Sequence, residues 1–181
     1  MTAVRTNVKR ARGMPETELL ELSWEFFGEL CRVLALKVAG DGFEPDLVVG
    51  IAKAGVIPGA VVASILRCDF YSLKISRDSG RDRPLTRPKI LSAAPKDAAG
   101  KRVLVVDEIC TSGETMRIAL NAMRQVSPEE VRTATSLIKV GGYRPDYHAL
   151  ETSATVVFPW DRHILNDAGQ IVGNPIYEGL T

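Results

Sequence analysis

VLVVDEICTSGET, from Val103 to Thr115, is the stretch of this sequence that decides the fold we expect. It begins with four apolar residues of the kind found in a buried strand. Two acidic residues come next, and a segment rich in hydroxyl groups then leads into residues 113–126, where apolar side chains recur at helical spacing. A buried strand that continues directly into a helix indicates an α/β domain with a mostly parallel sheet.

The flanking segments repeat this alternation of strand and helix. Further upstream, apolar residues at helical spacing predict an amphipathic helix over residues 16–38, which ends before Gly40 and Gly42. Downstream of it, a strand, a helix and a second strand indicate a right-handed parallel crossover. We expect these strands at residues 47–51 and 70–75, the helix between them at residues 56–66, and a later strand at residues 131–140.

Length and composition predict a single globular domain. A chain of 181 residues is close to the roughly 150 residues of an average domain. The first residues carry several basic and few large apolar side chains, so we expect a disordered basic arm at residues 1–14 and the domain at residues 15–181. Within the domain, we predict a mobile loop at residues 76–101 and a hood or cap at residues 141–181.

Charge and hydropathy argue against several classes of function. A formal net charge of +1 is unlike that of a general nucleic-acid binder, so we expect no nucleic acid among the partners. No apolar run approaches the ~20 residues that span a membrane, and the N-terminus lacks the apolar segment of a secretory signal. These features predict a cytoplasmic protein without a membrane partner. Cys31, Cys68 and Cys110 show no CxxC spacing, so we expect reduced thiols rather than a disulfide framework or a zinc site.

Asp107 and Glu108 follow the buried strand at the position where ligands bind in an open α/β sheet. Two adjacent carboxylates are costly to bury unpaired, so they should face a polar ligand, a metal or solvent. Residues 110–115 offer hydroxyl groups and backbone amides at the start of a helix, which suits a phosphate group. A ligand with vicinal hydroxyls and a 5'-phosphate would satisfy both halves of the motif. The alternative is an ordinary acidic turn that caps the helix.

The same stretch resembles the motif of the type I phosphoribosyltransferase family, most closely that of its 6-oxopurine members. In that motif, two acidic residues follow an apolar strand, and a short loop ends in [ST]-G-x-[ST]. The resemblance implies a Rossmann-like single-domain α/β fold, with a mostly parallel sheet flanked by helices, a small hood and a mobile lid loop. It also implies a homodimer that binds phosphoribosyl pyrophosphate (PRPP) and a nucleobase, and that makes a nucleoside 5'-monophosphate and pyrophosphate, as in purine salvage.

The resemblance also assigns site residues. Mg²⁺ would be held by Asp107 and Glu108 through water, and these two residues would act in catalysis with Lys53 and Asp161. The PRPP-binding residues would be Ala52, Lys53, Ala54, Gly55, Asp107, Glu108, Cys110, Thr111, Ser112, Gly113, Glu114 and Thr115.

The loop Ala52-Lys53-Ala54-Gly55 places a cation and small residues after the first predicted strand of the crossover. It resembles the pyrophosphate loop of the family, in which a basic residue follows a cis peptide bond that does not involve proline. Here that bond would join Ala52 to Lys53. The alternative is a surface lysine in a tight turn.

Basic residues concentrate in the predicted mobile loop, in which we expect one short strand near Ile90. They are Arg77, Arg81, Arg83, Arg87 and Lys89. The functional interpretation is a lid that closes over an anionic substrate, excludes water and adds positive charge. A solvated basic loop is the alternative.

Four residues near the C-terminal end resemble a base-binding site. Lys139 ends a predicted strand and resembles the lysine that contacts the C6 oxygen of a 6-oxopurine. Phe158, Trp160 and Asp161 resemble a hood in which an aromatic ring stacks on the base and a carboxylate reads its edge. The alternatives are a lysine that marks the exposed end of a strand and aromatic rings that pack in the core.

Thr111 departs from the pattern of the 6-oxopurine members, many of which carry an aspartate at this position. A threonine hydroxyl does not ionise near neutral pH, so it cannot accept a proton from the base. Asp161 is the first candidate to replace that aspartate. The other possibilities are a base of another kind, or a regulatory protein that senses PRPP without catalysis.

Overall fold

The computed structural model describes residues 18–78 and 84–178 of the chain. The basic arm predicted at residues 1–14 lies outside the described residues. Contacts divide the described chain into two compact units. The larger unit comprises residues 28–152, and the smaller unit joins residues 18–27 to residues 153–178.

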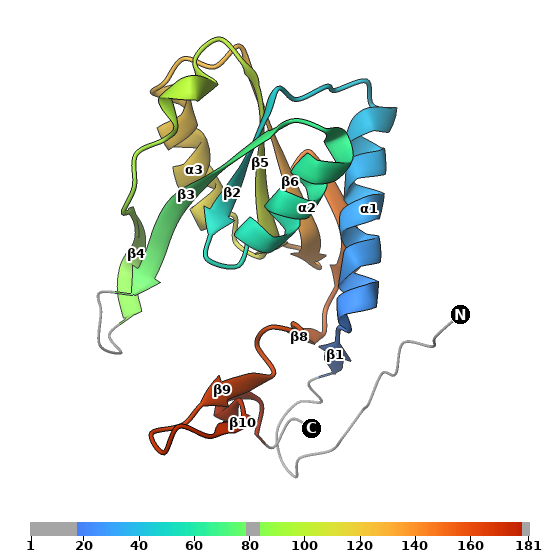
Figure 1. Ribbon diagram of the computed structural model, residues 1–181, viewed down its shortest axis with the longest axis vertical. Coiled ribbons are helices and arrows are strands. Elements are labelled where there is room, and N and C mark those ends of the chain that lie inside the picture. Colours follow the sequence, from blue (N-terminus) through green and yellow to red (C-terminus); the bar gives the residue numbers. More distant parts are fainter. Residues whose placement is uncertain (1–17, 79–83, 179–181) are drawn as a thin grey trace. The chain divides into compact units, whose positions relative to one another are not determined.

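The larger unit is built on a six-stranded sheet with the order β4-β3-β2-β5-β6-β7 (Figure 1). All neighbouring strands are parallel except β4, which runs antiparallel to β3. The prediction of an α/β fold with a mostly parallel sheet is therefore confirmed. The strands are β2 (Leu47–Ala52), β3 (Asp69–Asp78), β4 (Pro84–Ile90), β5 (Arg102–Cys110), β6 (Glu130–Lys139) and β7 (Tyr147–Thr152).

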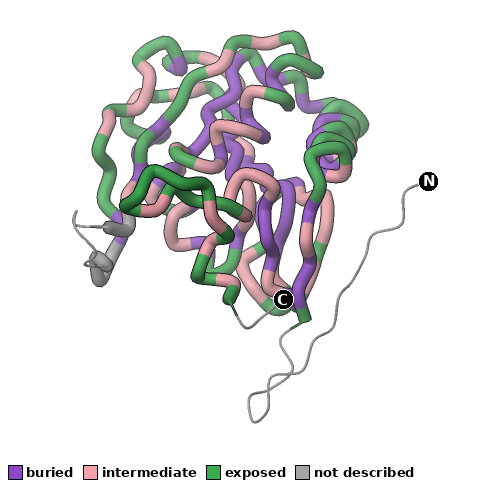
Figure 2. The backbone as a smooth tube through the Cα atoms, turned by 60° about the horizontal axis from the view of Figure 1, so that its bottom comes forward, coloured by how far each residue is buried: buried purple, intermediate pink, exposed green. Residues whose placement is uncertain are grey.

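The core of the larger unit lies against the two faces of this sheet, and buried residues follow its central strands (Figure 2). Helix α3 (Glu114–Arg124) covers one face, where its apolar side chains join those of β2, β3 and β5 in one cluster. Helix α2 (Val56–Leu66) covers the opposite face, and it has the bounds predicted from the sequence. The approach of α2 is close because Gly59 meets Gly50 of β2, where a Cβ on Gly59 would lie 3.1 Å from the Cα of Gly50.

The helix predicted over residues 16–38 begins later than expected. Residues Leu19–Glu21 form strand β1, and helix α1 covers Trp24–Gly40. The Ser23 hydroxyl accepts a hydrogen bond from the Phe26 amide (3.1 Å) and so caps the helix at this point. The early part of the prediction was wrong because a short apolar run fits both a strand and a helix, and pairing with a distant strand decides between them.

The smaller unit contains two small sheets. Strand β1 pairs in parallel with β8 (Thr155–Val157), and β9 (His163–Leu165) pairs antiparallel with β10 (Ile171–Gly173). A short 3-10 helix, η2 (Pro175–Tyr177), follows. The hood was predicted from residue 141, but β7 still belongs to the main sheet, and the C-terminal part of the smaller unit begins at Ser153.

Much of the segment predicted as a mobile loop, residues 76–101, has regular structure. Strand β3 extends to Asp78, and the strand expected near Ile90 is present as β4. A 3-10 helix, η1 (Lys96–Ala98), follows it. Residues 79–83 lie outside the described residues, and mobility stays a prediction. No helix among the described residues is long and apolar enough to cross a membrane.

Candidate functional site

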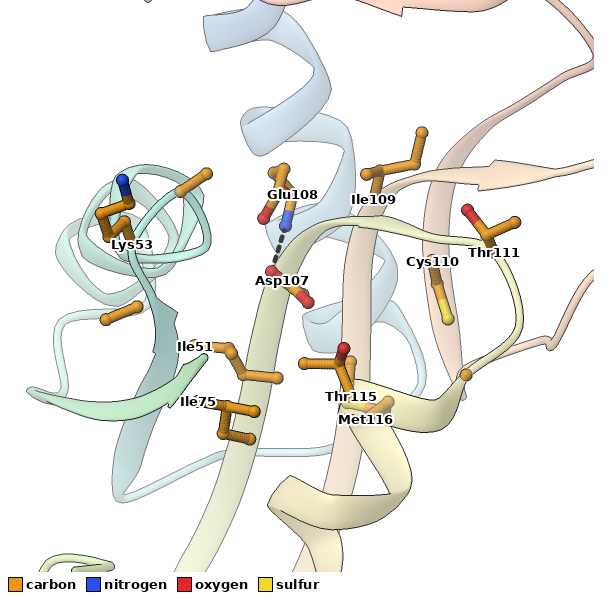
Figure 3. Close-up of a pocket in the computed structure, with 13 residues that line it drawn as sticks. Ile51, Lys53, Ile75, Asp107, Glu108, Ile109, Cys110, Thr111, Thr115 and Met116 are labelled. Carbon is orange, nitrogen blue, oxygen red and sulfur yellow. Dashed lines mark hydrogen bonds between the residues drawn. The ribbon is translucent and has the colours of Figure 1, made fainter. Parts of the chain in front are cut away.

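A cavity of about 400 Å³ opens where β2 and β5 separate. Strand β2 pairs with β5 only as far as Gly50 and Val106, whereas β5 continues beside β6 as far as Cys110. Strand β3 lies on one side of β2, and the chain later crosses to the other side of β2 to form β5. Ligands bind at the point where the strand order reverses in this way. The cavity is lined by Ile51, Ala52, Lys53, Ala54, Ile75, Asp107, Glu108, Ile109, Cys110, Thr111, Gly113, Thr115 and Met116 (Figure 3).

Asp107 and Glu108 lie in the part of β5 that extends beyond its pairing with β2. Both line the cavity. Asp107 is 9% exposed, and its Oδ1 accepts a hydrogen bond from the Glu108 amide (3.0 Å). The Glu108 side chain is half-buried, and no hydrogen bond or ion pair of its carboxylate is found within the described residues. The two carboxylates therefore differ, since Asp107 is anchored in the protein and Glu108 is available to a ligand.

Lys53 stands at the start of the loop after β2 and lines the cavity with Ala52 and Ala54 (Figure 3). The peptide bond between Ala52 and Lys53 is cis, as the resemblance implied. Gly55 does not line the cavity but lies directly behind Asp107, where a Cβ would come within 2.6 Å of Asp107 Oδ1 and of the Ile51 carbonyl oxygen. The glycine allows this loop to approach the acidic pair.

The hydroxyl-rich loop after β5 turns into helix α3 beside the cavity. Thr111, Gly113 and Thr115 line the cavity, whereas Ser112 and Glu114 do not. Gly113 adopts a left-handed conformation (φ 76°) directly before the helix begins. A helix N-terminus with free amides and nearby hydroxyls is suited to an anion such as a phosphate group.

Sequence reasoning missed several residues of this site. Ile75, Ile109 and Met116 form an apolar part of the cavity wall. Arg117 and Tyr143 contact the hydroxyl-rich loop without lining the cavity. The pair of glycines before Tyr143 could have indicated a close approach of two backbones, but nothing local shows which loop is approached.

Lys139 ends β6, as predicted, but it is not among the residues that line the cavity. Its side chain is half-buried, and this burial lowers the pKa of its ammonium group. Lys139 belongs to the larger unit, whereas the other predicted base-binding residues belong to the smaller one. The predicted base site combines both units, and it stays a prediction.

Phe158 and Trp160 stack on each other in the smaller unit, with ring centroids 4.7 Å apart and an angle of 16° between the planes. Phe27 packs edge-on against both rings. Phe158 is buried, so packing in the core accounts for it, whereas the half-buried Trp160 keeps part of its surface accessible.

Both carboxylate oxygens of Asp161 accept hydrogen bonds in the smaller unit. Oδ2 accepts one from the Tyr177 hydroxyl (2.5 Å), and Oδ1 accepts one from Asn174 Nδ2 (3.2 Å). Burial, and next the hydrogen bond to Asp161, raise the pKa of the Tyr177 hydroxyl. Asp161 therefore has a structural role within its unit in addition to any role toward a base.

Within residues 18–78 and 84–178, no group of three His, Cys, Asp or Glu residues is placed to hold a metal ion. The carboxylates of Asp107 and Glu108 do provide two acidic side chains on one cavity. This donor set fits Mg²⁺, which keeps several waters and is often bound by one or two carboxylates together with substrate phosphates.

A family model described as "Phosphoribosyl transferase domain" matches residues 22–166. "Phosphoribosyltransferase domain-containing protein 1" of Xenopus laevis is 33% identical to this chain over 91 residues, which cover 48% of this chain and 39% of that protein. "Xanthine-guanine phosphoribosyltransferase" of Gluconobacter oxydans (strain 621H) is 26% identical over 117 residues, covering 63% of this chain and 67% of that protein. The match thus spans from about two fifths to two thirds of the length of these relatives.

The fold is similar to that of a solved purine phosphoribosyltransferase from Pyrococcus horikoshii. The two structures give a TM-score of 0.69 at 26% sequence identity, and the match covers 78% of this chain and 93% of the other. The Rossmann-like fold implied by the sequence motif is thereby confirmed.

Proposed function

Because this chain belongs to the phosphoribosyl transferase domain family, we propose that it transfers the 5-phosphoribosyl group of PRPP to a 6-oxopurine base. The products would be a nucleoside 5'-monophosphate and pyrophosphate, as in purine salvage. One observation carries the proposal: a single cavity combines the Lys53 cation, the two carboxylates of Asp107 and Glu108, and three residues of the following loop, Thr111, Gly113 and Thr115. PRPP carries a pyrophosphate, two ribose hydroxyls and a 5'-phosphate, which correspond to these three elements.

Each part of PRPP has a proposed partner in the cavity. The 5'-phosphate binds the hydroxyls and amides of residues 111–115 at the N-terminus of α3, where the helix dipole favours an anion. The ribose hydroxyls donate hydrogen bonds to Asp107 and Glu108. The pyrophosphate lies near Lys53, whose exposed ammonium group compensates its negative charge.

These residues then act mainly by positioning the reactants and stabilising charge. As pyrophosphate leaves, positive charge develops at the anomeric carbon of the ribose, and the two carboxylates stabilise it electrostatically. A nitrogen of the base captures this carbon with inversion. Asp107 and Glu108 would hold Mg²⁺ through water, and the ion would neutralise charge on the leaving pyrophosphate.

For the base, we propose Lys139 at the C6 oxygen and Trp160 or Phe158 as the stacking ring. The partial exposure of Trp160 favours it over Phe158, because Phe158 is buried. Thr111 lines the cavity, but its hydroxyl cannot take a proton near neutral pH. We therefore propose Asp161 as the group that accepts the proton of the base.

The ribbon formed by β3 and β4 is proposed to be the lid. Ile75 of β3 lines the cavity and pairs with Ile90 of β4, so this ribbon begins at the edge of the site. Binding of Mg-PRPP and a base analogue should protect residues 76–101 from proteolysis. Unchanged cleavage of this segment would contradict the lid.

The homodimer and the cytoplasmic location also remain proposals, which rest on the family resemblance and on composition. Sedimentation equilibrium should give about twice the 19.7 kDa mass of the chain. A mass near that of one chain would contradict the dimer.

The decisive experiment is to follow pyrophosphate release by the purified chain with PRPP, Mg²⁺ and a panel of hypoxanthine, guanine, xanthine, adenine and orotate. We expect turnover with at least one 6-oxopurine, and loss of turnover in the Glu108→Gln variant. Turnover with adenine or orotate alone would show a phosphoribosyltransferase for a different base.

A second candidate function is a regulatory protein of the same fold that senses PRPP. The observation that favours it is Thr111, which brings no acid to the cavity. PRPP binding measured by calorimetry, together with no turnover on any base, would support the sensor and contradict the proposed enzyme.

A further inference from the structure

The segment after β6 is attached to the phosphate-binding loop by its backbone. The Tyr143 amide donates a hydrogen bond to the Thr111 carbonyl oxygen (2.8 Å), and the Gly142 amide donates one to the Lys139 carbonyl oxygen (2.9 Å). The two backbones are so close at this point that a Cβ on Gly142 would overlap the Thr111 carbonyl group. Two loops that follow neighbouring strands are therefore joined at the edge of the cavity.

Two side chains reinforce this attachment. The Tyr143 ring lies against Gly113, where a Cβ would overlap the ring. The guanidinium carbon of Arg117 lies 4.9 Å from the centroid of the same ring, and Arg117 Nη1 donates a hydrogen bond to the Ser112 carbonyl oxygen (3.0 Å). Tyr143 and Arg117 thus contact three successive residues of the loop, and we call this pair the brace.

The brace fixes the direction of amides that a phosphate needs. In a planar trans peptide, the carbonyl oxygen and the next amide N–H point in opposite directions. Because the Thr111 and Ser112 carbonyls are held by the brace, the amide N–H groups of Ser112 and Gly113 point to the opposite side. Amides that are oriented before binding do not have to be ordered when the anion arrives, and this raises affinity.

We propose that Tyr143 and Arg117 are positioning residues that pre-organise residues 111–115 for the 5'-phosphate of the substrate. This inference rests on the proposed function, since it concerns the same cavity. Arg117 is exposed, whereas the half-buried Tyr143 also packs against the core cluster of the larger unit. Removal of the ring should therefore lower the melting temperature as well, so phosphate affinity is measured on the folded chain.

The test compares Tyr143→Ala with Tyr143→Phe in the full chain. Dissociation constants for PRPP with Mg²⁺ and for ribose 5-phosphate alone are measured by calorimetry, together with the melting temperature. We expect Tyr143→Ala to weaken both ligands about tenfold or more, since hydrogen bonds to a charged group are lost or lengthened. Tyr143→Phe keeps the ring and should bind like the wild type. Tyr71→Ala is the matched control, because Tyr71 lies on β3 and does not line the cavity.

Gly142→Ala provides a second variant that changes neither charge nor ring. Its Cβ displaces the Thr111 carbonyl, so it should weaken both ligands in the same way. Gly28→Ala is its control, because a Cβ on Gly28 meets no atom within 4 Å. In steady-state kinetics, both test variants should raise the KM for PRPP, and Tyr143→Ala should leave the KM for the base unchanged.

The outcomes separate the brace from the proposed function. A folded Tyr143→Ala chain that binds ribose 5-phosphate as tightly as the wild type would overturn the brace. Equal loss in Tyr143→Phe would also overturn it, because the hydroxyl would then contact the ligand directly. A wild-type chain that binds ribose 5-phosphate but not PRPP would contradict the proposed function and leave the brace testable with the simpler ligand.

Discussion

Gly55→Ala should damage the site because of one added methyl group. Its Cβ would lie 2.6 Å from the Ile51 carbonyl oxygen, 2.6 Å from Asp107 Oδ1 and 2.9 Å from the Asp107 Cα. Ordinary contacts begin at 3.4 Å, so the shortest of these are about 0.8 Å too short. Two of the three atoms belong to the backbones of β2 and β5, which pair with each other just below this point and cannot separate freely.

The expected magnitudes follow from this overlap. Overpacking of this kind costs roughly 1–3 kcal/mol of unfolding free energy. The Asp107 side chain is the part that moves most easily, so its carboxylate should be displaced from the cavity. A shift approaching 1 Å in a catalytic group can cost about a hundredfold in rate. We therefore expect kcat/KM to fall about a hundredfold while most of the chain remains folded.

Urea unfolding and pyrophosphate release measure the two effects separately. Gly59→Ala is the matched control, because it adds a methyl to helix α2 just after Gly55 and meets the Phe70 ring at 2.9 Å and the Gly50 Cα at 3.1 Å rather than a residue of the site. It should lose a similar amount of stability and keep most of its activity. Equal activity losses in Gly55→Ala and Gly59→Ala would refute the idea that Gly55 positions Asp107.

Three further predictions concern charged and titratable groups. The double variant Asp107→Asn with Glu108→Gln should abolish pyrophosphate release with little change in melting temperature. Unfolding of this variant would show instead that the two carboxylates are needed for the fold. Burial raises the pKa of the Cys31 thiol from 9.0 to about 11, so its neutral form is favoured in the folded chain. The resulting stability, about 3 kcal/mol, is present below pH 9 and should be lost as the pH rises from 9 to 11, which urea unfolding at several pH values measures. Tyr177→Phe removes the hydrogen bond that the Tyr177 hydroxyl donates to Asp161, but it keeps the carboxylate. This variant should therefore retain the proton acceptor that Asp161→Asn lacks. Equal pH–rate profiles for the two variants would contradict Asp161 as that acceptor.

Local sequence signals predicted the parts of the fold and site that depend on local structure. Helix α2 has the predicted bounds because its apolar run of 11 residues is longer than a typical buried strand and follows a glycine-containing loop. Asp107 and Glu108 could be placed because a strand end and a helix start bracket them within one short motif. Strand β1 was mistaken for helix because its partner, β8, lies more than a hundred residues away along the chain.

The cavity itself could not be predicted from any one segment. It exists because β2 ends at Ala52 while β5 continues to Cys110, and this difference appears only when the two strands are paired. The same holds for the brace, in which Tyr143 reaches Gly113 from the loop after β6. Sequence motifs thus identify which groups are present, whereas strand pairing decides which of them share a cavity.

Thr111 shows how pairing changes the interpretation of a single residue. By its chemistry alone, it is a hydroxyl where an acid was expected, which weakens the case for catalysis. In the structure, its carbonyl oxygen accepts a hydrogen bond from the Tyr143 amide. That bond directs the amide of Ser112 away from the brace. Any residue at this position offers the same carbonyl, so phosphate binding does not require the missing acid. Acceptance of the proton from the base is then independent of phosphate binding. A carboxylate elsewhere in the chain can accept this proton without disturbing the phosphate site.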